Sequence, residues 1–66
     1  MVDISVYEDS RLLFQFKTHL NIMVGECIYY LGKNYKVIGK TYNTYDEEEY
    51  FAKLYSISLE VIEIEE

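Results

Sequence analysis

The expected fold depends first on residues 27–42, which read CIYYLGKNYKVIGKTY. β-Branched and aromatic side chains fill residues 27–31 and 35–42, as they do in β-strands. Between these segments, residues 32–34 (Gly-Lys-Asn) predict a tight turn, because glycine and asparagine supply the positive φ angles that short hairpins need. Gly39 interrupts the second segment and predicts a bulge or sharp bend. The stretch therefore predicts a β-hairpin.

The N-terminal part of the chain predicts a second hairpin. Residues 2–7 (VDISVY) and 12–18 (LLFQFKT) alternate along their length, which is the pattern of half-buried strands. The polar residues 8–11 between them predict a turn. Residues 19–26 connect this hairpin to the next strand, and we expect three of their side chains to turn toward the core: Leu20, Ile22 and Val24.

Near the C-terminus, residues 56–64 (SISLEVIEI) predict another strand. Its apolar side chains change face along the segment, from Leu59 and Val61 to Ile62 and Ile64. Such a change of face predicts a bulge near the end of this strand.

Residues 45–55 leave two interpretations open. Residues 44–47 (Thr-Tyr-Asp-Glu) match a helix capping box, which predicts one short helix. Alternatively, Phe51 and Tyr55 have the even spacing that continues the apolar face of residues 56–64, which predicts one long strand. We favour the strand for residues 49–55.

The chain as a whole predicts an all-β fold in a single domain, residues 1–66. Five or six short strands joined mostly by tight turns are typical of an antiparallel meander curled into a small barrel. Closing the sheet also covers its edges, which otherwise invite pairing with other chains.

The length and composition predict a fold that needs support. A chain of 66 residues has a marginal hydrophobic core. Its one cysteine cannot form an internal disulfide, and one cysteine with one histidine cannot supply the four ligands of a structural zinc site. Tight packing or self-association remains, so we expect a homo-oligomer.

Two features of the sequence predict the compartment. No apolar run approaches the ~20 residues that span a bilayer. Residues 1–10 lack the basic start and the apolar core of a signal peptide. We therefore expect no membrane association, a cytoplasmic location, and Cys27 as a reduced thiol.

Negative charge is concentrated in the last third of the chain. Residues 1–45 contain four acidic and five basic residues, whereas residues 46–66 contain eight acidic residues and one basic residue, Lys53. Such an asymmetry indicates an interaction surface. Direct binding of nucleic acid is disfavoured, because that requires positive patches.

Tyrosine is over-represented, with eight residues against three phenylalanines. Tyrosine is frequent at binding hot spots, although β-sheets also favour it without any partner. Tyrosines beside the acidic cluster suit a protein interface, and we predict these partner-binding residues: Tyr42, Tyr45, Asp46, Glu47, Glu48, Glu49 and Tyr50.

Features of an enzyme are weak in this sequence. His19 is the only histidine, and we expect it on the surface or in a loop. Cys27 suits a small apolar strand position better than a catalytic thiol. The acidic run 46–49 lacks the alternation and the glycine of a calcium loop, and the three glycines are isolated. We therefore expect a protein without catalytic activity, cofactor or metal.

Part of the chain resembles the SH3-like small barrels. Residues 24–30 (VGECIYY), a glycine turn and residues 35–38 (YKVI) are similar to the opening of these folds. The resemblance implies that Ile28 and Tyr30 face inward. In size and composition the chain also resembles short, acidic, tyrosine-rich proteins of bacteriophages and mobile elements, several of which inhibit host defence systems.

These observations favour a phage-type inhibitor whose acidic, tyrosine-containing surface binds a basic surface on a host defence or nucleic-acid-binding protein. The chain would then act in the host cytoplasm. One alternative is an oligomeric module that sequesters a nucleotide, stacking it on tyrosines and binding its phosphates with Arg11, Lys33, Lys36 or Lys40. Another is a small structural homo-oligomer.

Overall fold

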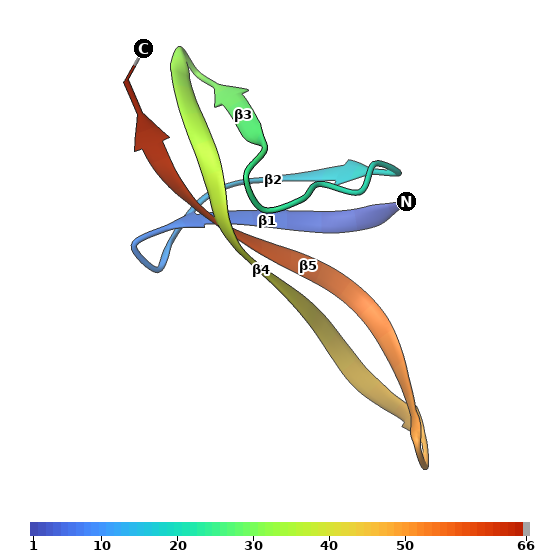
Figure 1. The fold of residues 1–66 in the computed structure, drawn as a ribbon. Helices are drawn as coiled ribbons and strands as arrows, with labels where there is room; N and C mark the ends of the chain where they lie inside the picture. Colours follow the sequence, from blue (N-terminus) through green and yellow to red (C-terminus); the bar gives the residue numbers. More distant parts are fainter. Residues whose placement is uncertain (66) are drawn as a thin grey trace.

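The computed structural model describes residues 1–65 and contains one five-stranded sheet (Figure 1). Its strands are β1 (Val2–Glu8), β2 (Arg11–Thr18), β3 (Cys27–Tyr30), β4 (Lys33–Glu48) and β5 (Phe51–Ile64). No helix occurs in the described part of the chain, so the all-β prediction is confirmed. Of the two interpretations of residues 45–55, the short helix does not form, and the favoured strand is correct for residues 51–55. Glu49 and Tyr50 instead form a turn, and residues 45–48 belong to β4.

The strands lie across the sheet in the order β2-β1-β5-β4-β3. Neighbouring strands pair antiparallel except β1 and β5, which run parallel from Ile4 opposite Ile57 to Tyr7 opposite Glu60. The sheet is therefore mixed rather than a purely antiparallel meander, and it curls into a half-barrel. β5, the last strand of the chain, lies at its centre.

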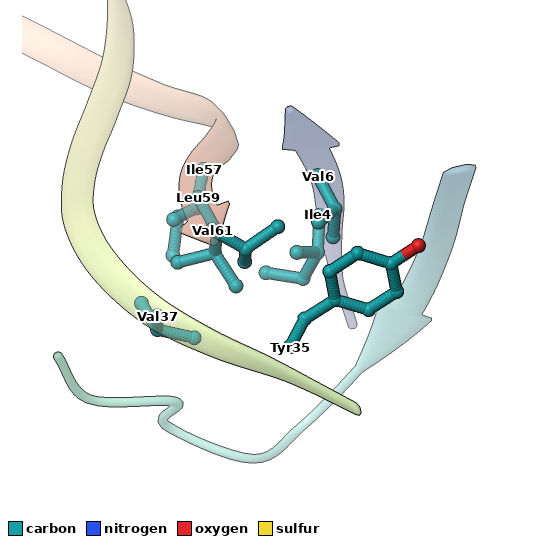
Figure 2. Close-up of a cluster of buried hydrophobic side chains, with 7 residues drawn as sticks. All are labelled: Ile4, Val6, Tyr35, Val37, Ile57, Leu59 and Val61. Atoms are coloured by element: carbon teal, nitrogen blue, oxygen red, sulfur yellow. The ribbon is translucent and has the colours of Figure 1, made fainter. Parts of the chain in front are cut away.

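The hydrophobic core lies inside this curl (Figure 2). β5 contributes every second side chain, Ile57, Leu59 and Val61, because alternate residues of a strand point to the same face. Val6 and Val37 come from the strands on either side, and both are fully buried, with 0% of the residue exposed. Ile4 and Tyr35 complete the buried cluster.

An aromatic contact brings the two edges of the sheet together. Phe14 of β2 and Tyr30 of β3 stack with their ring centroids 3.9 Å apart and their planes at 17°. Tyr30 and Ile28 pack against the core, as predicted. The curl is thus held between its edge strands by side chains, since β2 and β3 are not neighbours in the hydrogen-bonded order.

The connection between β2 and β3 contributes less to the core than predicted. Of its three apolar side chains, only Ile22 packs against the core, whereas Leu20 is 76% and Val24 is 56% exposed. The segment is an irregular loop whose side chains do not alternate between faces. Backbone hydrogen bonds tie its end to β4, from Gly25 N to Val37 O (2.8 Å) and from Val37 N to Glu26 O (2.9 Å).

The β3–β4 turn is shorter than predicted and begins one residue earlier. Tyr30 pairs with Lys33, so the turn consists of Leu31 and Gly32, with φ angles of 48° and 78°. Positive φ at both positions is typical of a type I′ turn. The prediction that Asn34 supplies a positive φ is wrong, because the strand already begins at Lys33 and includes Asn34.

A bulge lies where the sequence indicated one, but on the other strand. The β4–β5 register shifts between Val37 opposite Val61 and Gly39 opposite Glu60, so the unpaired residue is Ile38 of β4. The predicted interruption at Gly39 is confirmed. The extra residue therefore lies in β4, and β5 itself has no bulge near its described end, where one was predicted.

We expect Leu59→Ala to lower the free energy of unfolding by about 3 kcal/mol, because the change leaves a cavity at a fully buried position. Urea denaturation followed by circular dichroism measures this loss. Leu20→Ala is the control, since Leu20 is 76% exposed and its loss should stay within about 0.5 kcal/mol. Equal stability of the two variants would contradict the core described above.

We expect Leu31→Asn to raise the free energy of unfolding by about 1 kcal/mol, because leucine at a φ of 48° is strained and asparagine tolerates this conformation. The same denaturation experiment measures the gain. Leu20→Asn, which also replaces an exposed leucine, should give no gain, and an unchanged Leu31→Asn protein would argue against the turn.

Candidate functional site

The two longest strands, β4 and β5, continue past their neighbours as a two-stranded hairpin (Figure 1, lower right). β3 pairs with β4 only as far as Lys36, and β1 pairs with β5 only from Ile57 onward. We call residues 43–55 the arm and the remaining sheet the body. The arm explains the elongated shape of the molecule, whose principal extents are 47 × 23 × 18 Å.

Every residue from 44 to 55 is exposed. The exposed apolar side chains come from both strands and the turn: Tyr45 (47% exposed), Tyr50 (94%), Phe51 (67%), Leu54 (40%) and Tyr55 (62%). A two-stranded hairpin is marginally stable by itself, and clustered exposed apolar side chains mark interaction sites. The arm is therefore the candidate functional site.

Asn43 joins the base of the arm to the body. Its Nδ2 donates hydrogen bonds to Oγ of Ser56 (3.0 Å) and to Oγ of Ser58 (2.8 Å). Ser58 lies opposite Ser5 in the parallel pair, and Ser5 Oγ accepts a hydrogen bond from Nε2 of Gln15 (3.0 Å). This row of polar side chains crosses four strands on the face opposite the core and lines a groove of about 610 Å³.

One face of the arm carries a pair of tyrosines. Tyr45 lies opposite Lys53, and its ring meets that of Tyr55 edge to face, with the centroids 6.2 Å apart. The register shifts between Asn43 and Thr44, which makes Tyr55 the extra residue of a bulge in β5. The bulge allows Tyr55 to share a face with Tyr45.

Tyr42 lies just below the arm and on its other face. It pairs with Ile57 at the border of the core and is 57% exposed. The Nζ of Lys40 lies 5.0 Å from the centroid of the Tyr42 ring, within the range of a cation–π contact. Tyr42 and Tyr45 are three positions apart on one strand, so they point to opposite faces.

The end of the arm is acidic. Asp46, Glu47 and Glu48 are the last residues of the arm in β4, Glu49 lies in the turn, and Tyr50 follows at a φ of 68°. The salt bridges among the described residues lie in the body, between Lys17 and Asp3 (3.9 Å) and between Lys33 and Glu63 (3.5 Å). Within residues 1–65, the carboxylates of the arm thus face solvent without an ion-pair partner.

All seven predicted partner-binding residues lie on β4 or in the turn after it, and six of them belong to the arm: Tyr45, Asp46, Glu47, Glu48, Glu49 and Tyr50. Their role in binding stays a prediction. Sequence analysis missed the β5 side of the arm, which carries Phe51, Leu54 and Tyr55. The spacing of Phe51 and Tyr55 predicted that they continue the core face, but among the described residues only β4 pairs with this part of β5, and both side chains are exposed.

The remaining candidates lie apart from the arm. His19 and Cys27 are exposed in the body. In the described part of the chain, no group of three His, Cys, Asp or Glu side chains is placed to hold a metal ion. Lys33 pairs with Glu63, and Lys40 donates to Oδ1 of Asn21 at 2.7 Å. The described residues form no helix that could cross a membrane.

We expect Asn43→Ala to lower the free energy of unfolding by about 2 kcal/mol, because the change removes both hydrogen bonds to the serine hydroxyls at a half-buried site. Thermal unfolding monitored by circular dichroism measures this loss. Asn21→Ala is the matched control, since its hydrogen bond with Lys40 is exposed to solvent and the loss should stay within about 0.5 kcal/mol. Similar losses in both variants would contradict the role of Asn43 at the base of the arm.

Comparison with known proteins leaves the arm as the basis for any functional conclusion. No protein-family model, curated protein or solved structure matches this chain.

Proposed function

We propose that this chain is a non-catalytic interaction protein whose arm binds a basic groove on another protein. One observation supports the proposal above all others: residues 44–55 are exposed on both strands and combine aromatic side chains with carboxylates that lack ion-pair partners within the described residues. Aromatic side chains supply much of the free energy of protein association. Unpaired carboxylates speed the encounter with a positive surface and fix orientation.

The shape of the arm favours a groove over a flat surface. The arm is two strands wide, and adjacent strands lie about 4.8 Å apart. Tyr45 and Tyr55 lie on one face, and alternation places Thr44 and Leu54 on the other. A flat partner would cover one face only, whereas a groove would cover both.

The charge pattern and the chain's resemblance to small acidic phage proteins suggest the kind of target. A host protein that binds DNA or RNA, such as a defence protein, presents a positive surface to phosphates. The four consecutive acids, Asp46 to Glu49, would occupy that surface in place of phosphates. In this form of the proposal, the chain inhibits its target by competing with nucleic acid.

The alternative of a nucleotide-sequestering module has less support. Such a module needs several cations at one site, but Lys33 and Lys40 make different contacts, seven positions apart on β4. Lys40 also lies over the ring of Tyr42. The ring would have to lose this contact before that face could stack on a base.

Photo-crosslinking can identify the partner. The full chain carries p-benzoylphenylalanine either at Tyr50, which is 94% exposed in the arm, or at Tyr29, which is 74% exposed in the body. Both proteins are irradiated in a lysate of the cell that makes the chain, and mass spectrometry identifies the adducts. We expect a protein with a basic surface to be captured from position 50 only. Capture of the same proteins from both positions, or no capture at all, would sink the proposal.

We expect neutralisation of the arm to weaken binding to the captured protein by at least about tenfold. The variant replaces Glu47, Glu48 and Glu49 by glutamine, and calorimetry measures its Kd. The control carries Asp9→Asn, Glu60→Gln and Glu65→Gln, at exposed acids outside the arm. Each triple variant raises the formal net charge from -6 to -3, so a difference between them reports position rather than total charge.

Charge reversal and added salt test further whether negative charge on the arm promotes binding. Lysine in place of Glu47, Glu48 and Glu49 should abolish binding, and added salt should weaken binding of the unmodified chain. If the arm variant and the control bind equally well, the acidic end of the arm is not the interface.

A further inference from the structure

Both edges of the arm lack a neighbouring strand. β5 pairs with β1 only from Ile57 onward, so residues 51–55 have no strand on the side away from β4 within the described chain. β4 pairs with β3 only from Lys33 to Lys36. An unpaired edge presents a row of backbone N–H and C=O groups that can pair with another strand.

The two edges differ in charge. The β4 edge ends in Asp46, Glu47 and Glu48, so two such edges would repel each other. The β5 edge reads FAKLY over residues 51–55, with one positive charge and three large apolar side chains. Phe51 and Tyr55 have high β propensity and the segment contains no proline, which favours edge-to-edge pairing. The β5 edge is thus suited to a second copy of itself.

The structure also gives a physical reason for such pairing. Isolated two-stranded hairpins are marginally stable, and three or more strands are needed for independent stability. Pairing of two arms would make a four-stranded sheet in the order β4-β5-β5-β4. The apolar side chains of both β5 segments would then lie at its centre, where Phe51, Leu54 and Tyr55 are now exposed.

We propose that the chain forms a homodimer in which the β5 edges of two arms pair antiparallel, with Ala52 of one copy opposite Ala52 of the other. Antiparallel strands related by a two-fold axis perpendicular to the sheet place one residue opposite its own copy. An axis at Lys53 would set two like charges opposite each other, and an axis at Leu54 would set Phe51 opposite Ile57, where β1 already lies. An axis at Ala52 keeps the pairing clear of β1 and places Lys53 opposite Phe51 of the second copy.

This pairing leaves the acidic β4 edges on the outside of the dimer. It depends on the backbone and side chains of residues 51–55, not on the carboxylates, so it does not rest on the proposed function. Its tests use the purified chain without any partner. Failure of the dimer and failure of partner binding are therefore separate outcomes.

Disulfide trapping tests the register. Cys27 is a free, exposed thiol and is first replaced by serine. Ala52→Cys then places two thiols opposite each other across the axis, where Cα atoms of antiparallel pairs lie about 4.5–5.5 Å apart, within the range that a disulfide spans. With diamide as oxidant, we expect most of this protein to become a covalent dimer on a non-reducing gel.

Asp46→Cys in the same background is the matched control. Asp46 lies directly opposite Ala52 within one arm. In the proposed dimer the two Asp46 positions are three strand spacings apart, about 14 Å, which is too far for a disulfide. Equal crosslinking of the two variants, or no crosslinking of Ala52→Cys, would overturn the proposal.

Hydrogen exchange of the unmodified chain is a test that needs no substitution. On going from low to high protein concentration, backbone amides within residues 51–55 should exchange more slowly, by about tenfold or more. Amides within residues 43–48 of β4 that point to the free edge should not change. Exchange independent of concentration, or protection confined to β4, would exclude the β5 interface.

Discussion

The position of β5 between two strands is the constraint on which the rest of the molecule depends. From Ile57 to Glu60, β5 pairs with β1 on one side and with β4 on the other. There its alternate side chains, with Leu59 fully buried, form the middle of the core. Over residues 51–55, β5 has only β4 beside it within the described chain, and each of these residues is exposed. Before Ile57, where β1 no longer pairs with it, the same strand forms one half of the arm.

Much of the fold could be predicted from the sequence, because alternation of apolar and polar residues marks a strand wherever one face is buried. Residues 2–7 and 12–18 follow this rule and form β1 and β2. Alternation does not identify a strand's neighbours, so the parallel pairing of β1 with β5 could not be predicted. It also does not fix turns to one residue, and Leu31 occupies a position that would ordinarily favour glycine or asparagine.

The candidate site was predictable in part, and for a different reason. Charge is visible in composition, so Asp46 to Glu49 stood out without any knowledge of structure. Phe51 and Tyr55 did not, because their spacing matched that of Ile57 and the core face. Two structural facts separate them from the core: the bulge at Tyr55, and the absence of a third strand beside residues 51–55 in the described chain. Neither the bulge nor the missing strand can be recognised from the local pattern of apolar and polar residues.

The polar row at the base of the arm has a consequence for how the molecule can vary. Asn43 and the serines of β5 fix where the arm leaves the body, and the core ends at the same level. Within the described chain, the strand residues beyond this point pair only with each other. Two residues added to each strand would keep every side chain on its face and extend the arm by about 6.8 Å. Insertions of this kind would change the length of the arm without altering the body.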